Sequence, residues 1–387
     1  MNVIDGQAGR VRYYSLIFYS LTINNILNII ILLILAGISI SVLTNTGIFG
    51  KAKEAKKKSE DATLEQNKIL DNYEKEVDQY LPAFTGNTVE EAIQHGRVLN
   101  ATDNTELHDE KGNKIVVPAG FKVTGDATTI DKGIVIEDAT TGATSGSQFV
   151  WIPVGTITKA DGTTVGINLN RYAFDSNGIP TEKNEEVIDA YYSETASKGN
   201  TVAKSISNFK SSVTTNGGYY IGRYEARTTT ARNDKENDLT QITEKGTDQV
   251  YNYVTQLQAA SQAQNMYNDS NFTSDLMNSY AWDTATLFLQ NCGTNKKYSR
   301  QTSLNSSLLQ TGTNTLTETN KIDKQCNVYD MASNVREWTT ETSSNSGVPC
   351  VGMGGGYYYS NSYTSGRGDS GTSGSYNFVG FRPLLYL

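Results

Sequence analysis

The chain has 387 residues, a formal net charge of −8 and a sequence pI near 5.0. This length indicates two or three structural units. The acidic balance argues against nucleic acid as a partner, because phosphate binding requires clustered Lys and Arg. Only 37% of the residues are hydrophobic, while Tyr alone reaches 23, so we expect a polar surface rich in tyrosine.

An uncharged apolar run near the N-terminus predicts a membrane helix. Residues 26–43 read ILNIIILLILAGISISVL. About 20 such residues in a helix can cross a bilayer core of about 30 Å. A secretory signal peptide and a buried soluble helix are the alternatives. The run is long for a signal sequence and lacks a clear small-residue cleavage site, which favours the membrane helix within an N-terminal segment 1–47.

The next residues, 48–82, predict a charged stalk helix. Ile69, Tyr73, Val77 and Leu81 recur every four residues and form one apolar stripe. The stretch 31–62, ILLILAGISISVLTNTGIFGKAKEAKKKSEDA, resembles the N-terminal region of type IV pilin-like proteins of Gram-positive bacteria. The preceding GQAGRVRYYSL lacks the glutamate of the family's processing site, so the sequence departs from that pattern.

Charges beside the predicted membrane helix leave its orientation open. Arg10 and Arg12 precede it, and five lysines follow it between residues 51 and 58. The positive-inside rule alone would place the C-terminal side in the cytoplasm. The resemblance to pilin-like proteins implies the opposite orientation, with the C-terminal part on the extracellular face, and we adopt that expectation.

Residues 83–148 predict a small β-module or linker. KIVVPAGFKV and GIVIED read as short strands that are broken by turn residues. No motif with a recognisable chemistry is present in this stretch.

Five motifs follow in order along residues 149–387. They are FVWIPVG (149–155), GGYYIGRYEAR (217–227), SYAWDTATLFLQ (279–290), NVYDMASNVREW (327–338) and VGFRPLLYL (379–387). Together they resemble the formylglycine-generating-enzyme, or sulfatase-modifying, domain. That resemblance implies an α+β, C-type-lectin-like fold with long loops.

Most motif residues are expected to be structural. Trp151, Trp338, Phe381 and Tyr224 are predicted core aromatics. Glu225 and Arg382 are predicted internal salt-bridge or hydrogen-bond partners, because buried charges require such partners.

The resemblance does not extend to the family's oxidase chemistry. Its copper is bound by two cysteines near the C-terminus, whereas residues 354–377 contain none and Cys350 stands alone before them. Both histidines precede residue 149, so the domain has no histidine to act as a general base. We therefore predict that the protein is not an enzyme, with residual formylglycine-type activity as an alternative.

Calcium is the one cofactor that the resemblance implies. Family members hold Ca²⁺ with an asparagine and a glutamate that match Asn334 and Glu337, and oxygen ligands suit this ion. The sequence here is SNVREW where the family has GNVWEW, and Arg336 adds a positive charge beside the site.

Residues 357–377, the tyrosine-rich segment, carry the clearest functional signal. Twenty of its 21 residues are Tyr, Ser, Asn, Thr, Gly or Asp, and five are tyrosines. Disordered segments are poor in aromatic residues, whereas this mixture is typical of antibody paratopes. The predicted ligand-binding residues are Tyr357, Tyr358, Tyr359, Ser360, Asn361, Tyr363, Thr364, Arg367, Asp369, Ser370, Thr372, Ser375, Tyr376 and Asn377.

The same six residue types are all reached from the asparagine codon AAC by changing one or both adenines. Adenine-directed mutagenesis is the means by which diversity-generating retroelements vary their target proteins. Those targets often carry a lectin-like domain whose variable stretch precedes a GFRP-like ending, and VGFRPLLYL follows the segment here. The sequence thus resembles a retroelement variable protein.

We therefore predict that the chain is a bacterial, membrane-anchored cell-surface protein that binds an external protein or glycan through the tyrosine-rich segment. A pilin-like structural subunit of a surface fibre is the alternative from a different functional class.

Overall fold

The computed structural model describes residues 54–59, 61–63, 65, 66, 69, 83–184, 206–234, 242–309, 322–359 and 361–387. The chain divides into two compact units, Met1–Leu81 and Pro82–Leu387. In the first unit, residues 54–59 and 61–63 are helical, within the predicted stalk. The predicted membrane helix at 26–43 lies outside the described residues. None of the helices in the described ranges has the length and apolar character needed to span a bilayer.

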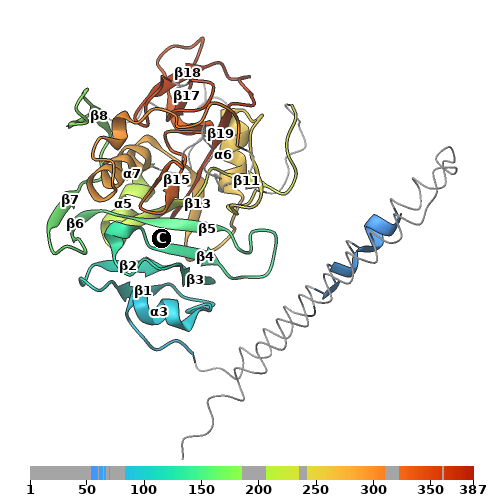
Figure 1. Cartoon of the computed structure of the whole chain (residues 1–387), viewed down its shortest axis with the longest axis vertical. Helices are drawn as coiled ribbons and strands as arrows, with labels where there is room; N and C mark the ends of the chain where they lie inside the picture. Colours follow the sequence, from blue (N-terminus) through green and yellow to red (C-terminus); the bar gives the residue numbers. More distant parts are fainter. Residues whose placement is uncertain are drawn as a thin grey trace, which may run out of the picture. The chain divides into compact units, whose positions relative to one another are not determined.

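A six-stranded sheet forms the centre of the second unit (Figure 1). All its neighbouring strands are antiparallel, and three of the six come from parts of the chain far from the others. The C-terminal strand is an inner strand of the sheet, so the end of the chain is built into the core. In spatial order the strands are β13 (Thr273–Leu276), β20 (Pro383–Tyr386), β10 (Gly218–Gly222), β5 (Gln148–Pro153), β4 (Val135–Asp138) and β3 (Phe121–Thr124).

This sheet corrects the domain boundary expected at residue 148. Strand β4 lies before that residue and pairs with β5 after it, with Ile136 opposite Phe149. The hydroxyl of Tyr220 on β10 also donates to the carbonyl of Val116, at 2.9 Å. Residues 83–148 therefore belong to the same compact unit as 149–387. The expected boundary falls at the end of the loop that connects β4 to β5, whose sequence ATTGATSGS (139–147) is typical of a linker.

The first part of the unit packs beside the outer strand β3. Helix α3 (Val89–His95) begins with a capping box in which Thr88 and Glu91 bond each other's backbone N–H. Strands β1 (Thr105–His108) and β2 (Lys114–Val117) form an antiparallel pair, and a 3₁₀ turn, η2 (Ile130–Lys132), precedes β4.

Three helices pack around the central sheet. They are α5 (Ile206–Asn216), α6 (Gln256–Gln264) and α7 (Ser279–Cys292). The motif at 279–290, in which Trp282, Ala285 and Leu289 recur at helical spacing, lies within α7. Asn278 caps α7, since its side-chain oxygen accepts a bond from the N–H of Ala281 at 2.9 Å. Residues 279–290 of α7 are all buried, so this helix is an internal support on which other elements rest.

A second sheet of four strands lies at the end of the unit opposite α3 (Figure 1). Its order is β18 (Arg367–Ser370), β17 (Cys350–Met353), β16 (Arg336–Thr342) and β19 (Val379–Phe381). Strands β16 and β19 run parallel, and the other two pairings are antiparallel. The tyrosine-rich segment connects β17 to β19 and contributes β18, so this sheet positions it.

Short two-stranded pairs and one further 3₁₀ turn complete the described fold. They are β6 (Gly155–Thr158) with β7 (Thr164–Ile167), β8 (Tyr172–Phe174) with β9 (Pro180–Glu182), β11 (Arg227–Thr228) with β12 (Gln249–Val250), β14 (Lys324–Gln325) with β15 (Val328–Tyr329), and η3 (Tyr298–Arg300). The unit is thus a strand-rich, mixed α/β fold.

The predicted core aromatics are buried. Trp151, Trp338, Phe381 and Tyr224 are each at most 7% exposed. The predicted internal role of two charged residues is also confirmed. Arg382 bonds both carboxylate oxygens of Glu337. Glu225 accepts a bond from the backbone N–H of Val335 at 2.9 Å.

The shared sheet predicts one cooperative unfolding transition for a chain that begins at Pro82. If β3 and β4 are part of the same core as β10 and β20, no partly folded state should accumulate. The calorimetric and van't Hoff enthalpies should therefore agree. Two transitions, with one assigned to residues 83–148, would restore the boundary at 148.

Candidate ligand-binding surface

The tyrosine-rich segment is held to the fold at both ends. At its start, the N–H of Tyr357 donates to the carbonyl of Asn334 at 2.8 Å. Just beyond its end, the carbonyl of Phe378 accepts a bond from the N–H of Arg336 at 3.0 Å. Both contacts lead to the residues that open β16, so the sheet fixes the two ends of the segment next to each other.

The middle of the segment is fixed by Thr364. Its hydroxyl donates to the carbonyl of Tyr298 at 2.7 Å, and its N–H donates to the carbonyl of Gln301 at 3.0 Å. Its own carbonyl accepts a bond from the indole N–H of Trp282 on α7, at 2.9 Å. Thr364 is fully buried. It was predicted to contact ligand, and the structure instead makes it an internal support, because its side chain completes the bonding of a buried turn.

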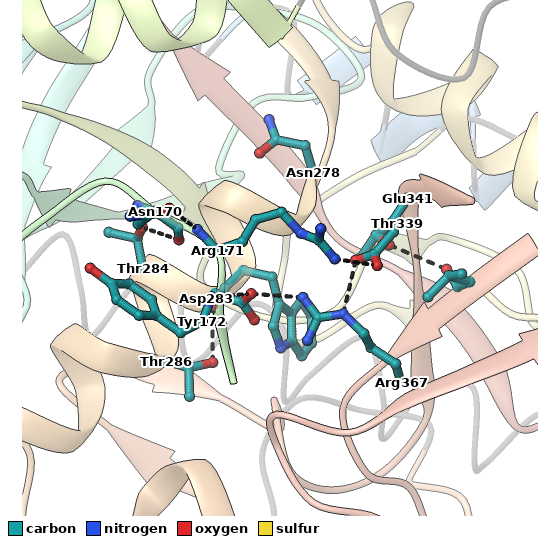
Figure 2. Close-up of polar contacts among 12 residues, drawn as sticks. Asn170, Arg171, Tyr172, Asn278, Asp283, Thr284, Thr286, Thr339, Glu341 and Arg367 are labelled. Carbon is teal, nitrogen blue, oxygen red and sulfur yellow. Dashed lines mark hydrogen bonds and ion pairs between the residues drawn. The ribbon is translucent and has the colours of Figure 1, made fainter. Parts of the chain in front are cut away.

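Arg367 joins the segment to three charged residues, Asp283, Glu341 and Arg171. These four residues form the ion cluster (Figure 2). Its Nη2 lies 2.7 Å from Oδ2 of Asp283 on α7, and its Nε lies 2.9 Å from Oε2 of Glu341 on β16. Arg171 also points toward Glu341, with its Nη2 2.5 Å from Oε1. Arg367 was predicted to offer charge to a ligand. Its guanidinium is used inside the protein instead, and its side chain is only 25% exposed.

The ion cluster perturbs the titration of Asp283. Burial raises the pKa of this carboxyl to about 6, although the Arg367 guanidinium acts in the opposite direction. The same carboxylate oxygen accepts a bond from the N–H of Tyr172 at 2.8 Å. Asp283 is thus a buried acid whose charged form depends on Arg367.

Three tyrosine rings of the segment are exposed. Tyr358 is 61% exposed, Tyr376 41% and Tyr359 39%. Phe378 is stacked with Tyr358 at 4.2 Å between ring centroids and with Tyr376 at 4.9 Å, both nearly parallel. Tyr359 is perpendicular to Tyr358 and Phe378, at 5.0 and 5.3 Å. These four residues form one cluster, the aromatic surface.

The remaining predicted residues differ in exposure. Tyr363 is half-buried, and the guanidinium carbon of Arg300 lies 3.5 Å from its ring centre. Tyr357 is half-buried, and burial raises its pKa. Ser360 lies outside the described residues. The others divide into an exposed group, Asn361, Asp369, Thr372 and Asn377, and a half-buried group, Ser370 and Ser375.

Two members of this region were not predicted from the sequence. Phe378 lies just outside the segment, yet it is the centre of the stack. It lies in a turn in which the N–H of Val379 donates to the carbonyl of Tyr376, and no pattern in the sequence indicated that its ring would stack on Tyr358 and Tyr376. Arg336 was noted only as a departure from the family pattern. Its guanidinium carbon lies 4.4 Å from the ring centre of Tyr359, and both residues line a groove of about 280 Å³.

The residues predicted for calcium do not fit that ion. Both carboxylate oxygens of Glu337 are bonded to the guanidinium of Arg382, at 2.5 and 3.0 Å. The side-chain oxygen of Asn334 accepts a bond from the N–H of Leu309 at 2.8 Å, and its nitrogen donates to Glu225. The side-chain oxygen atoms that would coordinate a Ca²⁺ ion are already bonded to protein partners. Within the described residues, no group of three or more His, Cys, Asp or Glu side chains is arranged to hold a metal.

The cysteines lie apart from the tyrosine-rich segment in sequence and differ in burial. Cys350 on β17 is buried, while Cys292 and Cys326 are half-buried and line a separate groove of about 490 Å³. Burial raises the pKa of Cys292 to about 12 and that of Cys326 still further. Both thiols are therefore protonated at neutral pH, which makes them poor nucleophiles.

The ion cluster predicts that Arg367 matters for stability. Arg367→Met would leave the buried Asp283 without its cation, and removing one partner of a buried pair typically costs about 3 kcal/mol or more. Tyr358→Ala, in contrast, should change the free energy of unfolding by less than about 1 kcal/mol, because that ring is largely exposed. Urea denaturation of the two variants measures this difference. Equal losses of stability in the two variants would show that Arg367 supports the fold no more than the exposed Tyr358 does.

A second prediction concerns pH. Since the pKa of Asp283 is about 6 in the folded chain and about 3.9 in an unfolded one, the folded state binds this proton more tightly. Its contribution to the free energy of unfolding should therefore fall as pH rises from about 4 to about 6. Asp283→Asn removes this titration, so wild type should lose stability relative to the variant over that interval. A relative gain would mean that the pKa is lowered, not raised.

Comparisons with known proteins give two remote likenesses. No protein-family model matches the chain, and no curated protein matches it. Solved structures to which it is similar include Treponema denticola variable protein 1, with 12% identity and a TM-score of 0.35 over 64% of this chain and 99% of the other. The Major Tropism Determinant M1 Variant aligns over 79% of this chain and 99% of its own length, with 15% identity and a TM-score of 0.22. The geometry of the surface is therefore the basis for assigning a function.

Proposed function

We propose that the chain is a non-enzymatic ligand-binding protein of the lectin-like class, which binds an external protein or glycan through the aromatic surface. The observation that carries this proposal is the exposed stack of Tyr358, Phe378 and Tyr376 on a segment whose backbone is bonded to the core. Exposed clusters of large aromatic rings on a folded protein mark interaction sites.

The arrangement of the rings favours tight binding of a ligand. Tyr and Phe supply large contact area with few rotatable bonds, and rings that are already stacked lose little freedom on binding. Truncating an aromatic hot-spot residue typically costs about 2 kcal/mol or more in binding. The exposed residues Asn361, Thr372 and Asn377 of the same segment carry hydroxyl and amide groups that can supply adaptable hydrogen bonds.

We further propose that the tyrosine-rich segment is varied by adenine-directed mutagenesis. Its composition supports this, since 20 of its 21 residues belong to the six types named above, all of which have codons reached from AAC by changing adenines. The separation of support from surface makes such variation tolerable, because most exposed side chains can change without disturbing a buried bond. Variation at an exposed position would alter the ligand and leave the fold intact.

Membrane anchoring remains part of the proposal. The uncharged residues 26–43 would hold the protein in the membrane, with the binding unit on the extracellular face. The full chain should then require detergent for extraction, whereas a chain that begins at Pro82 should not. Full-length protein in the soluble fraction without detergent would contradict the anchor.

Substitution of exposed tyrosines tests the binding function. The full chain in detergent micelles is applied to arrays of surface proteins and glycans, beside the triple variant Tyr358→Ala, Tyr359→Ala, Tyr376→Ala. Signals of the wild type should fall at least about tenfold in the variant, while its melting temperature stays nearly unchanged. Ile179→Ala is the matched control, since Ile179 is 59% exposed and outside this surface. Retained binding in the triple variant would refute the assigned surface.

The gene provides a separate test of diversification. A near-copy of the coding stretch for residues 350–387 should lie close by, beside a reverse-transcriptase gene. The two copies should differ almost entirely where the near-copy has adenine. Absence of a near-copy, or differences spread evenly over the four bases, would reduce the segment to a fixed binding loop.

A further inference from the structure

The groove beside the aromatic surface contains a guanidinium without a carboxylate partner. Nη2 of Arg336 donates to the hydroxyl of Ser362 at 2.6 Å, but its Nε is buried and has no hydrogen-bond partner. No ion pair to Arg336 occurs within the described part of the chain, in contrast to Arg367 and Arg382, which are paired with acids. Burial lowers the pKa of Arg336, although Tyr359 and the Asp369 carboxylate act in the opposite direction, so its positive charge is only partly compensated by the protein.

Two facing glycines give this side chain its position. Gly352 on β17 pairs with Gly368 on β18. A Cβ on Gly352 would lie 3.0 Å from Cγ and Cδ of Arg336, and a Cβ on Gly368 would overlap its Nη1. The arginine therefore lies flat across the two strands, where larger residues would exclude it. Tyr359 lies against the same guanidinium, which restricts it further.

The groove has the shape and charge for one acidic group. It is about 280 Å³ in volume, with Arg336, Tyr359 and Gly368 among its lining residues and Tyr376 and Phe378 beside them. Asp369 also lines it, and its carboxylate accepts a bond from the hydroxyl of Ser343 at 3.0 Å. A carboxylate that enters would meet the guanidinium where it lines the groove, while its stem contacts the rings of Tyr376 and Phe378.

We propose that this groove binds the carboxylate of an Asp or Glu side chain of a protein ligand. The inference rests on the proposed function and names the chemistry of its ligand. A charge-assisted bond to an arginine already held in place is stronger than a neutral one and fixes the orientation of the partner. Within the groove a protein is favoured over a glycan, because Tyr358 and Tyr376 are stacked on Phe378 and the guanidinium of Arg336 lies over the ring of Tyr359, which leaves these two groove rings little free face for a sugar.

Small probes test the inference on the full chain in detergent micelles. Saturation-transfer NMR would compare N-acetylglutamate N-methylamide, the neutral glutamine analogue and methyl glucuronide. The glutamate probe should bind at least about tenfold more tightly than the glutamine probe, as a charge-assisted bond implies. Equal affinity of the two probes would overturn the proposal. Equal or tighter binding of the glucuronide would also overturn it, in favour of an acidic glycan.

Matched variants locate the binding. Arg336→Gln and Gly368→Ala should each abolish the preference for the glutamate probe, the second because the new methyl group displaces the guanidinium. Arg300→Gln should retain it, since Arg300 also lies over a tyrosine, Tyr363, but does not line this groove. Preference that persists in both groove variants would contradict the inference. If array binding depends on the tyrosines while the carboxylate preference is absent, only this inference fails and the proposed function stands.

Discussion

The surface of this protein depends on a buried ion cluster that holds the tyrosine-rich segment in place. Asp283 is wholly buried on α7, and a charge in that position requires a partner. Arg367 supplies it from the middle of the segment and shares Glu341 with Arg171 (Figure 2). If the segment left the core, Asp283 would remain as an unpaired buried charge. Detachment of the segment therefore has a large cost in free energy.

The residues of the tyrosine-rich segment therefore fall into two groups, one that bonds the core and one that is exposed. Thr364 and Arg367 point inward and bond the framework, while Tyr358 and Tyr376 point outward and pack on Phe378. Loops positioned by a rigid framework commonly carry function, since the framework fixes where their side chains point. A segment arranged in this way can change its outward residues and keep its path.

The sequence predicted exposed tyrosines in this segment, but it did not predict how the fold holds the segment. Tyrosines among small polar residues pointed to an exposed binding segment, and Tyr358 and Tyr376 are indeed exposed. Composition could not separate Arg367 from its neighbours, because its acidic partners are distant in sequence. The sheet that joins β4 to β20 escaped prediction for the same reason. Arg336 was visible in the sequence as a departure from the family pattern. Its position in the groove could be recognised only in the structure, where Gly352 and Gly368 lie against its side chain.

A substitution scan of residues 354–378 measures the division between support and surface most directly. Each position is changed to several residue types, and resistance of the folded chain to protease reports stability. We expect tolerance at 358, 361, 372, 373, 376 and 377, where side chains are exposed, and loss of stability at 364 and 367, where they are bonded to the core. Uniform tolerance across the segment would contradict the account, since it would mean that the ion cluster and the buried threonine do not hold the surface.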